Sequence, residues 1–192
     1  MRKGIISVFS TLILVAVIVS AAFITSVPGI KDLSLKANNE SVVKWYTFEE
    51  AIEINKKAPR KIFVDVYTDW CGWCKKMDAN TFNNPTVAEY LNEKYYPVKF
   101  NAEQRESIVF RDHTFKFIAQ GARGYHELAA ALLNNKLSYP TVVFLDEDFN
   151  MIQPLPGYQQ PNTFYPIIEF FGDDHYKKMN WQEFQKIYKS PF

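Results

Sequence analysis

Apolar and polar positions repeat along the chain with two periods, and the two periods predict strands and helices in an interleaved order. Short runs rich in β-branched and aromatic residues predict strands at residues 61–67, 96–101, 141–145 and 150–154. Apolar residues at intervals of three and four predict helices at residues 48–57, 75–80, 85–94, 125–134, 163–171 and 181–188. Because strands alternate with helices early and a hairpin comes late, we expect an α/β domain with a mixed central β-sheet flanked by helices on both faces.

Several of the predicted helices begin at recognisable capping signals. Thr47 with Glu50, and Asn180 with Glu183, have the spacing of a capping box, in which each side chain satisfies a backbone N–H of the other residue. Pro85 stands at a first helical position, where its missing N–H costs nothing. These signals place three helix starts.

Residues 104–134 predict an insertion between a central strand and the strand at residues 141–145. Residues 107–110 and 114–118 have strand character and predict one small hairpin around residues 111–113. The glycines at 121 and 124 predict a flexible turn, after which the helix at residues 125–134 begins.

The first 26 residues have the composition of a targeting segment. Arg2 and Lys3 precede the almost wholly apolar residues 4–24, and small residues around Ala21 suit a signal peptidase. The apolar run is also long enough to span a membrane, so a cleaved signal peptide and a retained N-terminal membrane anchor are both open. Either interpretation predicts a periplasmic or exported domain at residues 44–192, joined by a linker at residues 27–43.

Composition and charge narrow the class of protein. Hydrophobic residues make up 47% of the chain and aromatic residues 16%, which is enough for a sizeable core. The formal net charge of +1 and the lack of a Lys/Arg-rich stripe argue against a nucleic-acid partner.

The two cysteines, Cys71 and Cys74, lie between the predicted strand at residues 61–67 and the helix that follows it. The free N–H groups and partial positive charge of a helix N-terminus stabilise a thiolate, so the pKa of Cys71 should be lowered. A structural disulfide closing so short a loop would stabilise the fold little. A zinc site needs about four ligands, and the chain has no second CxxC and only scattered histidines. We therefore expect a redox-active pair with no metal and no cofactor, and metal carriage with a histidine is the weaker interpretation.

Residues 63–75 (FVDVYTDWCGWCK), 98–101 (VKFN), 139–141 (YPT) and 156–158 (PGY) together resemble the thioredoxin superfamily. The resemblance covers about residues 45–172 and is nearest to exported bacterial thioredoxin-like proteins. It implies a thioredoxin-like fold, here with a hairpin-helix insertion and a C-terminal helical extension.

The resemblance also implies roles for four residues in catalysis. Cys71 would be the nucleophile and Cys74 the resolving thiol. Asp65 would be a buried carboxyl with a raised pKa that takes and returns the proton of Cys74, with Lys99 beside it. The competing interpretations are an edge-strand acid for Asp65 and a solvated strand end for Lys99.

Four further residues are candidates for substrate binding. Trp70 and Trp73 flank the nucleophile and would form an apolar platform, although Trp70 could equally be packed. The resemblance implies that Pro140 is a cis-proline facing the cysteines and that the Tyr139 backbone binds an extended substrate, while a core tyrosine is the alternative. Trp73 stands where thioredoxin has proline, so thioredoxin's redox potential is not carried over.

The sequence thus predicts a thiol–disulfide oxidoreductase. Its partners would be disulfide-containing or dithiol protein substrates and a second thiol protein that exchanges electrons with it. His126 is a possible proton donor, with a surface or packed histidine as the competing interpretation. The alternative function is a binding or chaperone module for exported proteins, in which the cysteine pair is incidental.

Overall fold

The computed structural model describes residues 42–192. The predicted signal peptide or anchor at residues 1–26 and nearly all of the predicted linker lie outside this range. Within residues 42–192, no helix has both the length and the apolar character needed to cross a membrane.

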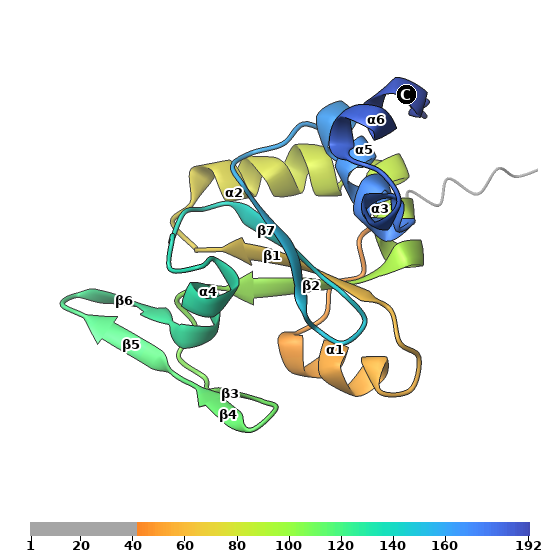
Figure 1. Cartoon of the computed structure of the whole chain (residues 1–192). Helices are drawn as coiled ribbons and strands as arrows, with labels where there is room; N and C mark the ends of the chain where they lie inside the picture. The colour runs from red at the N-terminus through yellow and green to blue at the C-terminus, as the bar shows by residue number, and fades with distance from the viewer. Residues whose placement is uncertain (1–41) are drawn as a thin grey trace, which may run out of the picture. The chain divides into compact units, whose positions relative to one another are not determined.

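A four-stranded sheet forms the centre of the described domain (Figure 1). Its strands, in spatial order, are β2 (Tyr95–Asn101), β1 (Lys61–Tyr67), β7 (Thr141–Leu145) and β8 (Met151–Pro156). β1 pairs in parallel with β2, whereas β7 is antiparallel to both of its neighbours. The predicted mixed sheet is therefore confirmed. The last strand runs two residues further than expected, through Pro154 and Pro156, because β8 is an edge strand and tolerates proline.

Helices cover both faces of this sheet, as predicted. On one face lie α1 (Phe48–Asn55) and α4 (Glu127–Leu132), which pack against alternate residues of β1 such as Val64. On the other face lie α2 (Gly72–Met77), α3 (Pro85–Lys94) and α5 (Pro161–Gly172), which pack around Phe63. The alternation of β1 side chains between two apolar layers explains why its sequence is apolar almost throughout.

The capping signals correctly mark the helix starts. Both predicted capping boxes form, at α1 and at α6 (Trp181–Ile187), and Pro85 is the first residue of α3. The helix expected at residues 75–80 begins earlier, at Gly72, and passes into a π-helical turn, η1 (Asp78–Phe82). A short 3₁₀ turn, η2 (His175–Lys177), connects α5 to α6.

The insertion differs from the prediction, because it contains two hairpins rather than one. β3 (Ile108–Phe110) pairs with β4 (His113–Phe115), and β5 (Phe117–Gln120) pairs with β6 (Arg123–His126). The first turn needs only two residues, since Arg111 adopts a positive φ of 55°.

The segment predicted as a flexible turn and helix start is the second hairpin. Gly121 has a positive φ of 60° and lies in the turn, whereas Gly124 lies within β6. A Cβ at Gly124 would come within 2.3 Å of the Phe117 ring, so this glycine permits a close cross-strand contact. The helix α4 consequently starts at Glu127, two residues later than expected.

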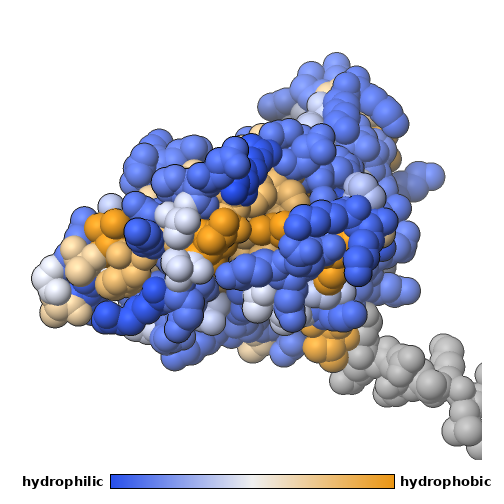
Figure 2. All heavy atoms as spheres, turned by 90° about the horizontal axis from the view of Figure 1, so that it is seen from below, coloured by the Kyte–Doolittle hydropathy of each residue, from blue (hydrophilic) through white to orange (hydrophobic). Residues whose placement is uncertain are grey.

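The two hairpins form part of a surface on the side of α1 where apolar and polar side chains are unevenly distributed. Figure 2, seen from below the view of Figure 1, shows apolar atoms gathered at the centre of this face and toward the projecting hairpin, within an otherwise hydrophilic surface. Val109 of β3 is among the exposed large apolar side chains of the domain.

Candidate active site

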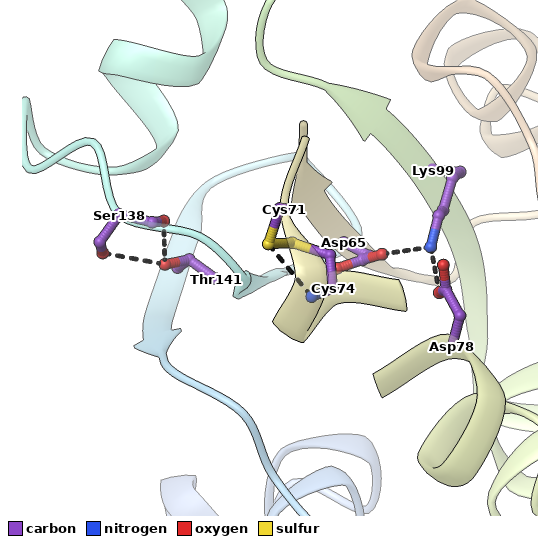
Figure 3. Close-up of a disulfide and its surroundings, with 7 residues drawn as sticks. All are labelled: Asp65, Cys71, Cys74, Asp78, Lys99, Ser138 and Thr141. Carbon is purple, nitrogen blue, oxygen red and sulfur yellow. Dashed lines mark hydrogen bonds and ion pairs between the residues drawn. A yellow bond between two sulfur atoms is a disulfide. The ribbon is translucent and has the colours of Figure 1, made fainter. Parts of the chain in front are cut away.

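Cys71 and Cys74 form a disulfide at the junction of β1 and α2 (Figure 3). Cys71 is the N-cap residue of α2, and the backbone N–H of Cys74 lies 3.1 Å from its Sγ atom and donates to it. This is the position predicted from the strand-to-helix pattern. A backbone N–H of the first helical turn is therefore directed at the sulfur that would carry charge in the reduced pair.

Asp65 lies in the apolar layer beneath the disulfide. Its side chain is 1% exposed, and β1 is an internal strand, so the interpretation of Asp65 as an edge-strand acid is wrong. Oδ2 accepts a hydrogen bond of 2.6 Å from Lys99 Nζ, while Oδ1 has no partner among residues 42–192. Burial raises the pKa of Asp65 to about 6, and the ammonium of Lys99 offsets only part of that rise.

Lys99 bridges two carboxylates rather than one. Its Nζ donates to Asp65 and also to Asp78, at the start of the π-helical turn (Figure 3). The rings of Trp45 and Tyr67 lie 4.9 Å and 5.0 Å from the same nitrogen. Burial alone would lower the pKa of Lys99, but the two carboxylates more than offset it and raise that pKa. Lys99 is therefore held as a cation within the site and is not a solvated strand end.

Asp78 contacts Lys99 in the candidate site and was not predicted from the sequence. It lies four residues after Cys74, the spacing that places two helical residues on one face. Its side chain is 40% exposed, in contrast to that of Asp65. The chain of Asp65, Lys99 and Asp78 thus leads from the buried side of the disulfide to solvent.

Two exposed tryptophans flank the disulfide. Trp70 and Trp73 are 54% and 57% exposed, so neither is a core residue. Trp70 packs edge-on against Tyr139, with ring centres 6.0 Å apart, and Trp73 packs against Tyr158 at 5.4 Å. Lys76 Nζ lies 4.7 Å from the ring centre of Trp73.

The loop that precedes β7 lies opposite the tryptophans. The Tyr139–Pro140 peptide bond is cis, and a groove of about 260 Å³ is lined by Trp73, Tyr139, Pro140, Gly157 and Tyr158. Tyr139 is half-buried, and burial together with Glu103 raises the pKa of its hydroxyl to about 12, so the hydroxyl stays neutral. Its backbone N–H and C=O make no hydrogen bond to residues 42–192. The groove therefore offers free backbone groups between aromatic side chains.

His126 has a packing role. It is fully buried, its Nδ1 accepts the backbone N–H of Leu128, and its Nε2 lies 3.1 Å from the carbonyl oxygen of Glu106. Burial lowers the pKa of the ring, which fits a neutral imidazole donating from Nε2. Since both ring nitrogens have partners, the structure gives no support to His126 as a proton donor. Among residues 42–192, no cluster of His, Cys, Asp or Glu is arranged to hold a metal ion.

The central sheet, the helices on its two faces and the CxxC at the start of α2 define a protein of the thioredoxin-fold class. Solved structures that share this fold include the following two. A thioredoxin-fold protein from Helicobacter pylori is 19% identical, with a TM-score of 0.53, over 78% of this chain and 89% of that one. A DsbH oxidoreductase is 16% identical, with a TM-score of 0.52, over 74% of this chain and 94% of that one.

Residues 31–155, more than half of the chain, match the family Thioredox_DsbH, described as "Protein of unknown function, DUF255", and the chain belongs to this family. An uncharacterized protein of Archaeoglobus fulgidus is 26% identical over 77 residues, which are 40% of this chain and 61% of that protein. The chain spans less than two thirds of the length of the curated relatives that it matches.

Proposed function

We propose that this protein is a thiol–disulfide oxidoreductase that exchanges the Cys71–Cys74 pair with protein substrates outside the cytoplasm. The observation that supports this most directly is the disulfide at the start of α2 above the buried carboxyl of Asp65. A structural disulfide has no need of an ionisable group in the apolar layer beneath it, because burying such a group costs free energy.

In the reducing direction, the Cys71 thiolate attacks one sulfur of a substrate disulfide. A mixed disulfide forms and the other substrate sulfur leaves as a thiolate. Asp65 accepts the proton of Cys74, whose thiolate then attacks Cys71 Sγ and displaces the second substrate sulfur. Two electrons pass to the substrate and the protein disulfide is formed. The reverse steps oxidise a substrate dithiol.

The buried Asp65 is suited to this proton transfer. Its pKa of about 6 leaves it mostly ionised at neutral pH and still basic enough to accept a thiol proton. Lys99, held as a cation beside it, favours the ionised form of Asp65 that accepts this proton.

The groove at Pro140 supports binding of an extended polypeptide. The free N–H and C=O of Tyr139 can pair with a substrate backbone as an added strand would. Trp73 and Tyr158 supply apolar contact on the far side of the groove. Because these groups recognise backbone and apolar surface, the proposed substrates are partly extended proteins and not small disulfides alone.

The exported location and the electron partner are part of the proposal. The targeting composition of residues 1–26 supports a domain outside the cytoplasm, attached or released. In that oxidising compartment, turnover as a reductase needs a second thiol protein that returns two electrons to the Cys71–Cys74 disulfide.

The test is reduction of insulin disulfides by the protein with dithiothreitol as electron source. Wild type should accelerate insulin reduction, and Cys71→Ser should reduce the rate to that of dithiothreitol alone. Cys74→Ser, the matched variant, should accumulate a mixed disulfide with a protein substrate, because it can attack but not resolve. Full turnover by Cys71→Ser would contradict the mechanism. Binding of unfolded substrate by a wild type without turnover would support the chaperone function instead.

A further inference from the structure

The β5–β6 hairpin of the insertion reaches the redox site. Figure 1 shows the hairpin projecting on the side of the molecule where β1 ends and α2 begins. The guanidinium of Arg123, at the start of β6, lies 5.3 Å from the ring centre of Trp70, the residue that precedes Cys71. The CxxC segment and the insertion therefore meet at one exposed aromatic ring.

A second groove, of about 320 Å³, lies between Trp70 and the hairpin. Glu103, Arg123, Tyr125 and Tyr139 are among its lining residues. Tyr139 also lines the groove at Pro140, so the two grooves meet at this residue. A polypeptide whose cysteine reacts with Cys71 would therefore have one groove available for the residues on each side of that cysteine.

The base of the hairpin is firmly held. The backbone N–H of His126, the last residue of β6, donates to the carbonyl oxygen of Ala102 at 2.7 Å. Glu127 Oε2 accepts the backbone N–H of Lys116 at 2.7 Å, just before β5 begins. Together with the contact of Phe117 over Gly124, these bonds fix the direction in which the hairpin presents Arg123.

Of the two charged side chains that line the second groove, Glu103 has a hydrogen-bond partner and Arg123 has none among residues 42–192. Glu103 Oε1 accepts the indole N–H of Trp70 at 3.0 Å. The guanidinium of Arg123 makes no hydrogen bond or ion pair with any residue in the range 42–192, although stacking on Trp70 orients it. A stacked guanidinium keeps its N–H edge free, and that edge matches a carboxylate with two parallel hydrogen bonds.

Building on the proposed exchange reaction, we propose that the β5–β6 hairpin forms a second wall of the substrate cleft and that Arg123 selects polypeptides with a carboxylate side chain next to the reacting cysteine. The carboxylate would bind the guanidinium over Trp70 while the backbone of the same segment passes Tyr139.

The test uses two peptides that differ only in having Asp or Lys beside a single cysteine, which is capped as its neutral methyl disulfide. The reduced protein gives two electrons to the cap, becomes the Cys71–Cys74 disulfide and releases the peptide thiol and methanethiol. Wild type should react faster with the Asp peptide, and Arg123→Glu should lower the Asp-to-Lys rate ratio by about ten-fold, since attraction becomes repulsion. Lys75 and Lys76 on α2 are present in every variant, so their charges do not distinguish the proteins compared.

The control is Lys57→Glu, which makes the same charge change at an exposed position after α1, outside the groove and outside the insertion. It should keep the wild-type ratio. An unchanged ratio in Arg123→Glu, with both peptides still reduced, would overturn the selectivity and leave the proposed function standing. Failure of wild type to release either peptide thiol would overturn both.

Discussion

At the scale of single residues, the candidate site contains a carboxyl that the fold keeps in an apolar layer. Asp65 belongs to the face of β1 that also carries Phe63, and it takes the place of a hydrophobic side chain there. Its one partner among the described residues is Lys99, which it shares with Asp78. The ionised form is thus only partly compensated, and the fold is less stable when Asp65 carries its charge.

The first prediction concerns the stability of Asp65→Asn. The folded-state pKa of Asp65, about 6, lies above the ordinary value of 3.8, so protonation of Asp65 favours the folded state. This contribution to folding stability is fully present below pH 3.8 and is lost as pH rises through 6. With the disulfide formed, the free energy of unfolding of Asp65→Asn should therefore rise relative to that of wild type by roughly 2–3 kcal/mol between pH 4 and pH 8. Urea titrations at several pH values measure this.

The control for this series is Asp69→Asn. Asp69 is exposed and accepts a hydrogen bond from Asn101 at the surface. Because Asp69 lies at the surface, Asp69→Asn should not reproduce the gain in stability expected for Asp65→Asn. A pH-independent difference for Asp65→Asn would show that the buried carboxyl does not carry a raised pKa.

Asp78 offers a second prediction at the same scale. Its charge raises the pKa of Asp65 directly, and its carboxylate competes for the Lys99 ammonium that lowers it. In Asp78→Asn both effects weaken, so the Asp65 pKa should fall below its wild-type value of about 6. The ¹³C chemical shift of the Asp65 carboxyl followed through a pH titration reports this directly. A pKa equal to or above that of wild type would contradict the three-residue arrangement.

At the scale of elements, agreement with the sequence follows the strength of the local signal. β1 was predicted to the residue because seven consecutive positions carry strand character and both faces of the strand are buried. Both capping boxes formed because each depends on only four residues. Asp78 was not predicted because its contact with Lys99 depends on the π-helical turn after α2, and no local sequence pattern predicts that turn.

The insertion shows where local signals are insufficient. Its strands are three or four residues long, too short for a period of two to be distinguished from chance. Gly124 suggested a turn, but its role is to admit the Phe117 ring from the neighbouring strand. The contact of Arg123 with Trp70 joins residues 53 positions apart in the chain, so only the folded structure reveals it.

His126 joins the second hairpin to α4, and a third prediction follows from its burial. Burial lowers its folded-state pKa below the ordinary 6.5, so its contribution is fully present above pH 6.5 and is lost as pH falls below that value. His126→Ala should lower the free energy of unfolding by about 2–3 kcal/mol at pH 7.5, because it leaves two polar partners unsatisfied and a cavity. The difference from wild type should narrow toward pH 5 in thermal unfolding scans. The matched control is His113→Ala, which removes a side chain that is 62% exposed and should change the free energy of unfolding by less than about 1 kcal/mol.

At the scale of the whole domain, the C-terminal extension is part of the core and not an appendage. The buried ammonium of Lys61, at the start of β1, bonds to Glu147 after β7 and to Asp174 beyond α5. Phe184 of α6 is 1% exposed and packs against Phe170 of α5, with ring centres 5.1 Å apart. α5 in turn contacts α3 and the π-helical turn that carries Asp78. The end of the chain thus supports the helical layer that carries the Cys71–Cys74 disulfide.

This arrangement predicts that Phe184→Ala destabilises the entire domain in one transition. Removing a fully buried phenylalanine costs about 3–5 kcal/mol, and because α6 shares its core with α5, the urea midpoint should fall for the redox site as well as for the extension. Ile187→Ala, at a position 59% exposed in the same helix, should change the free energy of unfolding by less than about 1 kcal/mol. The equilibrium constant of the Cys71–Cys74 pair with glutathione should stay at its wild-type value in both variants, since α6 contributes no group to the site. If Phe184→Ala instead produced two separate transitions, with the redox site unfolding at the wild-type midpoint, the extension would be an independent unit.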